Sequence, residues 1–195
     1  MEFSKEVLQD AADQGSNSVA KAFTKLSGEK VSVTASAAEL VSYKYITENL
    51  HSSHKNASFI TYAQMISGTT GVSILVIPRE ETLALVDLLS NQEIGSTGVL
   101  KDLDRSAVKE TLNILSNSYL TALSKISSME LIIGAPYMMT GKNLENLVGK
   151  VKDKAVDEEE NTLVFKTSLE IDKHKITAQL YLIFNEKFVD LIKTK

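Results

Sequence analysis

Apolar residues recur at intervals of three and four in two long segments of the chain. The first series of recurring positions begins at Leu8 and ends at Leu26, and the second begins at Val108 and ends at Ile126. This spacing gathers apolar side chains on one face of an α-helix. The pattern therefore predicts two amphipathic helices, each with one buried face.

A constant offset of 100 residues relates the two helical segments. The register continues beyond the helices, since Val31 matches Leu131 and Val33 matches Ile133. A fixed period of this kind indicates an internal duplication. We predict a single domain over residues 1–195, built from repeats of approximately 1–100 and 101–195.

Each predicted helix is followed by strand-like segments with alternating apolar positions. Such strands have one apolar face, which needs a covering layer of helices. The predicted fold class is therefore α/β of the two-layer α+β type: an antiparallel sheet covered on one face by the two long helices, with a pseudo-two-fold internal duplication. The expected strands are 30–34, 57–66, 72–77, 131–135, 162–171 and 176–184, and short helices are expected at 79–89 and 186–193.

Composition narrows the class of protein. Hydrophobic residues make up 43% and charged residues 24% of the chain, the formal net charge is −4, and there is no cysteine. These values are typical of a globular domain and exclude disulfides and zinc–sulfur sites. The basic residues are scattered, which argues against nucleic-acid binding. The sequence has no apolar run long enough to span a membrane and no secretory leader, so we expect a cytoplasmic protein with no membrane partner.

A polar series occupies the second helix on the side opposite its apolar face. It consists of Ser106, Glu110, Asn113 and Asn117, which fall within one narrow stripe at about 100° per residue. Polar residues are expected on any solvent-facing helix surface, so the spacing alone does not assign a function.

The wider pattern resembles the signature of the CheC-type phosphatases of the CheC/CheX/FliY family. That signature is Ser106-x-x-x-Glu110-x-x-Asn113, followed after 22 residues by Pro136, and the flanking residues through Leu123 are also similar to the family's second motif. Helix-plus-strands duplication is the architecture of the same family. The resemblance extends over nearly the entire chain.

The resemblance implies a phosphatase acting on a phosphorylated CheY-type response regulator, in chemotaxis and two-component signalling. The regulator carries its own Mg²⁺ and lysine around its aspartyl phosphate, so no cofactor or metal of this protein's own is expected. Glu110 and Asn113 are the implied catalytic residues: Asn113 would orient the attacking water and Glu110 would contact the regulator's lysine. Ser106 and Pro136 support the motif, and CheD is a second partner that the family suggests.

The first helix carries different chemistry at the matching positions. Subtracting the offset places Asp10 at the position of Glu110 and Asp13 at that of Asn113. Asp10 has a shorter reach than glutamate, and Asp13 lacks an amide donor and adds negative charge beside a phosphoryl group. We therefore expect a degenerate second site.

One alternative to a phosphatase stays open at this point. The polar stripe could instead belong to a non-catalytic binding module that docks a response regulator or CheD, as in a flagellar-switch role. The chain is too short for the additional switch domain of FliY, which favours a phosphatase.

His51 and His54 are three residues apart but have no evident third ligand, so we do not predict a metal site there.

Overall fold

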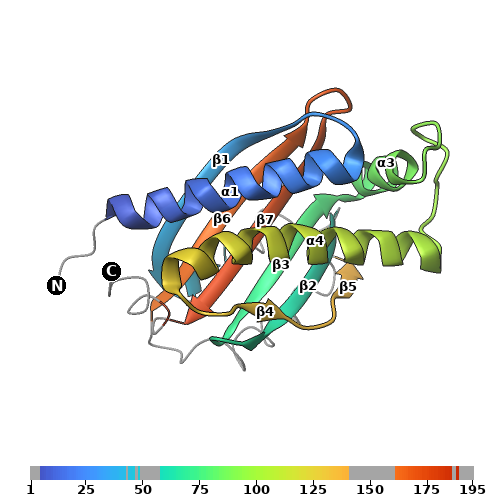
Figure 1. The fold of residues 1–195 in the computed structure, drawn as a ribbon. Helices are drawn as coiled ribbons and strands as arrows, with labels where there is room; N and C mark the ends of the chain where they lie inside the picture. Colours follow the sequence, from blue (N-terminus) through green and yellow to red (C-terminus); the bar gives the residue numbers. More distant parts are fainter. Residues whose placement is uncertain are drawn as a thin grey trace.

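Two long helices, α1 (Lys5–Ser27) and α4 (Asp102–Ser127), lie side by side on one face of a β-sheet (Figure 1). A shorter helix, α3 (Arg79–Leu89), directly precedes α4 in the chain. The structure is a computed structural model that describes residues 5–42, 44–46, 48, 58–140, 161–185 and 188. The two-layer arrangement confirms the predicted fold class.

The sheet is antiparallel throughout the described residues, with the strand order β1-β6-β7-β3-β2-β4. The fifth strand, β5, pairs with the same edge of β2 as β4 does. The strands are β1 (Val31–Ser42), β2 (Ser58–Ser67), β3 (Gly71–Pro78), β4 (Ile132–Ile133), β5 (Tyr137–Thr140), β6 (Asn161–Ile171) and β7 (Ile176–Asn185).

The strand order is symmetric about the β3–β7 pair. Strand β1 at one edge corresponds to β4 and β5 at the other, β6 corresponds to β2, and β7 corresponds to β3. The first strand of each half pairs with the other half, since β1 pairs with β6, and both β4 and β5 pair with β2. The two halves are therefore interleaved in one sheet. The limits of the two repeats in the sequence stay a prediction.

The strand limits differ from the sequence prediction mainly at the two sheet edges. Strand β1 continues to Ser42, well past the expected end at 34, and a bulge interrupts it between Val33 and Ala35. Beyond the bulge it is partly or fully exposed and lacks the apolar alternation of a buried strand. Strand β5 was not predicted, because Pro136 directly precedes it and only four residues form it. The helix predicted at 186–193, apart from residue 188, lies outside the described residues, and so do His51 and His54.

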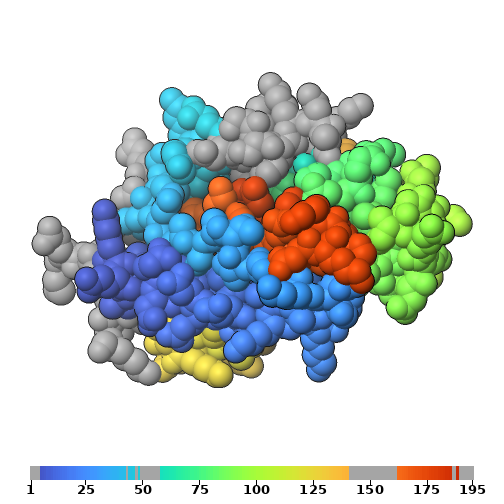
Figure 2. All heavy atoms as spheres, turned by 90° about the horizontal axis from the view of Figure 1, so that it is seen from above, coloured from blue at the N-terminus to red at the C-terminus, as the bar shows by residue number. Residues whose placement is uncertain are grey.

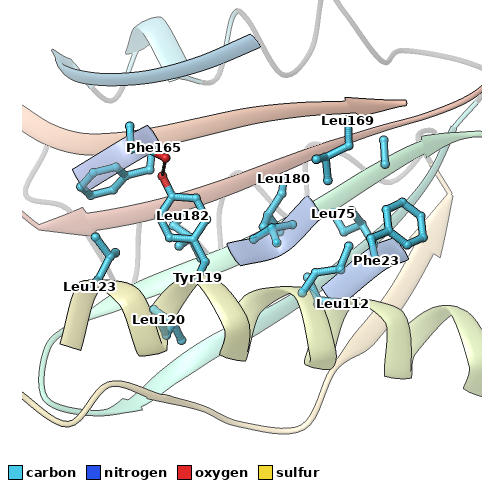
Figure 3. Close-up of a cluster of buried hydrophobic side chains, with 14 of the residues drawn as sticks. Phe23, Leu75, Leu112, Tyr119, Leu120, Leu123, Phe165, Leu169, Leu180 and Leu182 are labelled. Carbon is cyan, nitrogen blue, oxygen red and sulfur yellow. Dashed lines mark hydrogen bonds between the residues drawn. The ribbon is translucent and has the colours of Figure 1, made fainter. Parts of the chain in front are cut away.

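The main core fills the space between the helices and the sheet (Figure 3). The predicted alternation in β6 and β7 is confirmed, because these strands direct their alternate apolar residues into this core. Residues from both helices meet them there. The labelled members include Phe23, Leu112, Tyr119, Leu123, Phe165, Leu169, Leu180 and Leu182.

Gly15 of α1 lies directly against the ring of Tyr119 on α4. A Cβ atom placed on Gly15 would lie 2.1 Å from Cε1 of Tyr119. The Tyr119 hydroxyl donates a hydrogen bond to the backbone oxygen of Ala12 over 3.2 Å, and burial raises the pKa of this phenol well above its usual range. Since Gly15 and Tyr119 occupy neighbouring helices, their contact fixes how α4 lies against α1.

The face of the sheet turned away from the long helices is also apolar in its centre. A second buried cluster lies there, and β3 is buried at every position from Gly71 to Ile77. Among the described residues, Ile46 packs against this cluster. The central strands are therefore buried on both faces, as their continuous apolar sequence requires. The cluster contains Ile46, Ile60, Tyr62, Val72, Ile74, Val76, Val164, Tyr181 and Ile183.

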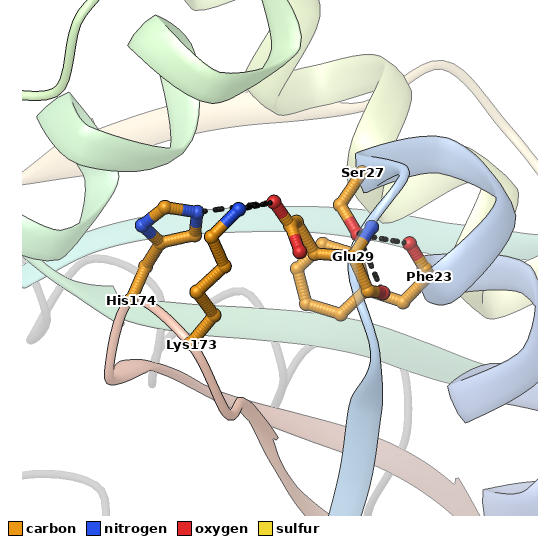
Figure 4. Close-up of polar contacts among 5 residues, drawn as sticks. All are labelled: Phe23, Ser27, Glu29, Lys173 and His174. Atoms are coloured by element: carbon orange, nitrogen blue, oxygen red, sulfur yellow. Dashed lines mark hydrogen bonds and ion pairs between the residues drawn. The ribbon is translucent and has the colours of Figure 1, made fainter.

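A charged contact joins the α1–β1 connection to the β6–β7 turn. Glu29 accepts hydrogen bonds from Nζ of Lys173 over 2.7 Å and from Nε2 of His174 over 3.3 Å (Figure 4). In the space-filling view the orange β6–β7 turn lies beside the blue residues of this connection (Figure 2). The hydrogen bond from Lys173 lowers the pKa of Glu29 below its ordinary value, and the hydrogen bond from His174 lowers it by a smaller amount.

Candidate functional site

The sequence around residue 101 defines the start of α4. Oδ2 of Asp104 accepts a hydrogen bond from the backbone N–H of Lys101 over 2.8 Å. Asp102 and Asp104 also place negative charge in the first turn, where the helix dipole favours it. These contacts define where the helix begins.

The candidate residues lie on the outer side of α4. Glu110 is exposed and Asn113 is partly exposed, while Val108, Leu112 and Leu115 are buried against the sheet. Glu110 and Asn113 are therefore neighbours within one helical turn on the outer face, as the sequence predicted.

A directed series of hydrogen bonds links three side chains of this face. Nδ2 of Asn117 donates to Oδ1 of Asn113 over 2.9 Å, and Nδ2 of Asn113 donates to Oε2 of Glu110 over 3.3 Å. The series fixes the amide orientation of Asn113, because its oxygen faces one neighbour and its nitrogen the other. The sequence placed Asn117 in the stripe without assigning it this contact, although the spacing of four residues permits it.

The remaining motif residues are Ser106 and Pro136, and neither has a side-chain hydrogen bond to this group. Ser106 is exposed, and its hydroxyl donates to the backbone oxygen of Asp102 over 2.9 Å. Pro136 is partly buried in the connection between β4 and β5. Two residues later, Met138 packs against the apolar cluster that includes Val108 of α4. The strand that follows Pro136 thus packs against the apolar cluster at the N-terminal part of α4.

The matching positions on α1 are bonded differently. Asp10 and Asp13 are both exposed; Asp10 accepts from Nε2 of Gln14 over 2.8 Å, and Asp13 accepts from Nε2 of Gln9 over 2.9 Å. Gln9 also donates to the backbone oxygen of Ser36 on β1 over 3.1 Å. The two carboxylates line a groove of about 870 Å³ between α1 and the end of β1. An ionised aspartate can only accept hydrogen bonds, so Asp10 and Asp13 do not offer a ligand the N–H donor that Asn113 has.

The candidate site is made of carboxylate, amide and hydroxyl groups of one helix. Within the described residues, no group of three or more His, Asp or Glu side chains is arranged to hold a metal ion. Over the same part of the chain, no helix has the length and apolarity needed to cross a membrane.

Comparison with known proteins yields matches at the level of structure. No protein-family model matches the sequence, and no curated protein matches it either. The solved structures include FliY from Thermotoga maritima, with a TM-score of 0.73 and 18% identity over 100% of both chains. A chain of the FliG–FliM complex from H. pylori superposes with a TM-score of 0.68 and 13% identity, covering 99% of this chain and 100% of that one.

A third match has a phosphoryl analogue in its crystal. The CheX–CheY–BeF3–Mg²⁺ complex from Borrelia burgdorferi matches with a TM-score of 0.55 and 13% identity, covering 91% of this chain and 99% of the other. The protein therefore shares the fold of FliY, FliM and CheX. More closely, it has the CheC/CheX/FliY fold, as the sequence resemblance indicated.

Proposed function

We propose that this protein hydrolyses the aspartyl phosphate of a CheY-type response regulator. The observation that carries the proposal is the hydrogen-bonded pair of Glu110 and Asn113 on the outer face of α4, which a flat or convex partner surface can reach. The similarity to a CheX that was crystallised with CheY supports the choice of partner. The protein would then act in the cytoplasm, where response regulators receive their phosphoryl groups.

The reaction needs positioning more than covalent chemistry. Water attacks phosphorus, the bond between phosphorus and the aspartyl oxygen breaks, and the products are inorganic phosphate and a free aspartate. Transfer of a phosphoryl group is accelerated mainly by alignment and charge stabilisation. The regulator would supply the Mg²⁺ and the lysine for charge stabilisation, so this protein needs no metal or nucleophile of its own.

Asn113 is suited to orient the water. Its Oδ1 has two lone pairs, of which Asn117 uses one, and its Nδ2 has two hydrogens, of which Glu110 accepts one. One acceptor and one donor position therefore stay open to hold a water molecule. A neutral amide also avoids the repulsion that a carboxylate would experience beside phosphoryl oxygens.

Glu110 is suited to bind a cation of the partner. Its exposed carboxylate lies one turn from Asn113, so a lysine beside the phosphoryl group could contact Glu110 while Asn113 faces the phosphorus. This pairing would set the register of the helix against the regulator's site.

The similarity to FliM middle domains favours a second candidate function. In this alternative the same face binds a response regulator, or CheD, without hydrolysis. The hydrogen bonds that orient the Asn113 amide favour catalysis, because docking alone does not require an oriented amide.

The test is the decay of phosphorylated receiver domains with and without this protein. Each CheY-type receiver of the source organism would be phosphorylated with acetyl phosphate, freed of the donor, and followed in the presence of Mg²⁺. We expect faster release of phosphate from at least one receiver. Binding to a receiver loaded with beryllofluoride, without faster decay, would favour the binding module.

A further inference from the structure

The first turn of α4 and the segment just before it carry the two most exposed large apolar side chains of the described residues. Leu103 is 81% exposed and Val99 is 72% exposed. A single exposed apolar residue is common on protein surfaces and needs no explanation. Two such residues only four positions apart, near the candidate site in the sequence, instead suggest a contact surface.

The segment that carries them is held firmly. Asp87 of α3 is fully buried, and its two carboxylate oxygens accept hydrogen bonds from the backbone N–H groups of Gly95 over 2.7 Å and Thr97 over 3.0 Å. Leu100 is buried against Val108 and residues of α3. The exposure of Val99 and Leu103 is therefore not a result of a loose loop: the chain on either side is anchored and these two side chains still face outward.

The helical register places Leu103 on the same stripe as the candidate catalytic residues. It precedes Glu110 by seven residues, which at about 100° and 1.5 Å per residue puts it about 20° away around the helix and about 10 Å away along it. The polar stripe of Ser106, Glu110, Asn113 and Asn117 thus continues into an apolar end at the start of α4.

We infer that Val99 and Leu103 form an apolar contact for the receiver domain whose aspartyl phosphate the site would hydrolyse, an inference that rests on the proposed function. Even a transient protein–protein contact covers up to about 600 Å² per partner, equivalent to a disc of about 14 Å radius. A receiver domain centred on Glu110 would therefore cover Leu103, about 10 Å along the helix, and Val99 would lie beyond Leu103 toward the rim of the contact. The matching receiver surface would be an apolar patch beside the phosphorylation site.

This arrangement divides recognition between two kinds of contact. Glu110 and Asn113 would contact groups common to all receivers, the phosphoryl group and the lysine beside it. Leu103 and Val99 would contact a part of the surface that differs among receivers. Because apolar burial is roughly proportional to area, a receiver with a polar surface at this point would bind more weakly. The apolar end would thus select the regulator.

The test measures KM and kcat for phosphate release from the receiver that the wild-type protein dephosphorylates. Leu103→Ala should raise KM about fivefold to thirtyfold with kcat unchanged, because the lost contact is the same before and during the reaction. Leu103→Met should restore most of the affinity. Leu40→Ala is the matched control and should leave KM unchanged. It is the same change at an exposed leucine of β1, the strand at the sheet edge opposite β4 and β5.

The outcomes separate this inference from the proposed function. An active wild-type protein whose KM is the same with Leu103→Ala would overturn the inference and leave the phosphatase proposal standing. A wild-type protein inactive on every receiver would overturn the phosphatase proposal; weaker binding of beryllofluoride-loaded receiver by Leu103→Ala would then still support the apolar contact. An unchanged KM accompanied by loss of self-association in sedimentation would assign the surface to a second copy of this chain instead.

Discussion

The side-chain amide nitrogen of Asn113 lies 3.3 Å from the Oε2 atom of Glu110, one turn earlier on the outer face of α4. A second amide, that of Asn117, donates to Oδ1 of Asn113 over 2.9 Å. The three side chains are therefore aligned in one direction before any partner arrives. Such preorganisation is what a reaction that depends on water positioning needs.

Asn117 is predicted to position Asn113. Asn117→Ala removes one hydrogen bond to Oδ1 of Asn113, worth about 1 kcal/mol, and should lower kcat about fivefold without changing KM. Asn117→Asp should be more damaging, because a carboxylate can only accept and would turn the Asn113 amide around. Steady-state phosphate release measures both variants. Asn17→Ala, at the matching exposed position of α1, is the control, and equal losses in both alanine variants would contradict the prediction.

The site on α1 is predicted to be silent but repairable. Asp13→Ala should change phosphate release by less than about twofold, because Asp13 has no amide and already accepts from Gln9. In an Asn113→Ala background, the pair Asp10→Glu and Asp13→Asn should recover part of the lost activity, since it restores reach and amide together. Phosphate release from the same receiver measures each variant. If Asp13→Ala were as harmful as Asn113→Ala, the ranking of the two sites would be wrong.

Gly15→Ala is predicted to destabilise the fold. Alanine favours a helix by about 1 kcal/mol over glycine, but the new Cβ would lie 2.1 Å from the buried ring of Tyr119. Overpacking of this kind costs about 1–3 kcal/mol and should dominate. Urea unfolding measures the change in the free energy of unfolding. Gly98→Ala, where the added Cβ meets no atom within 4 Å, is the control and should be neutral or slightly stabilising.

The contact of Glu29 with Lys173 and His174 predicts a loss of stability in acid. The pKa of Glu29 is lowered in the folded state, so the contact stabilises the fold above the ordinary pKa of 4.5 and this contribution disappears as the pH falls through the lower folded value. Glu29→Gln should therefore lower the free energy of unfolding at pH 7, and its difference from the wild type should shrink as the pH falls below 4.5. Urea titrations at pH 7 and at a series of lower pH values measure this. Lys173→Met should add little in the Glu29→Gln background, and a difference that grew toward low pH would refute the sign.

Several features of the fold could be predicted from the sequence because they depend on local periodicity. The stripe opposite Leu112 and Leu115 follows from 3.6 residues per turn, and so does the proximity of Glu110 to Asn113. The order of helices and strands follows from the 100-residue repeat, whose symmetric strand order was not evident until the pairing was known.

Other features depend on contacts that periodicity does not encode. Glu29 and His174 are 145 residues apart, and only the pairing of β1 with β6 brings them together. The outer part of β1 has little apolar alternation because it lies at an exposed edge, and β5 is only four residues long. The direction of the Asn113 amide requires atomic positions, since either orientation is compatible with the sequence.

The catalytic role of Asn113 is the central claim, and single-turnover decay tests it most directly. A saturating concentration of protein would be mixed with the phosphorylated receiver in Mg²⁺, and binding of the beryllofluoride-loaded receiver would be measured in parallel. We predict that Asn113→Ala slows the decay about a hundredfold while binding stays within about twofold, because the variant loses water positioning and keeps the docking surface. Decay at the wild-type rate in Asn113→Ala, with binding intact, would contradict the account.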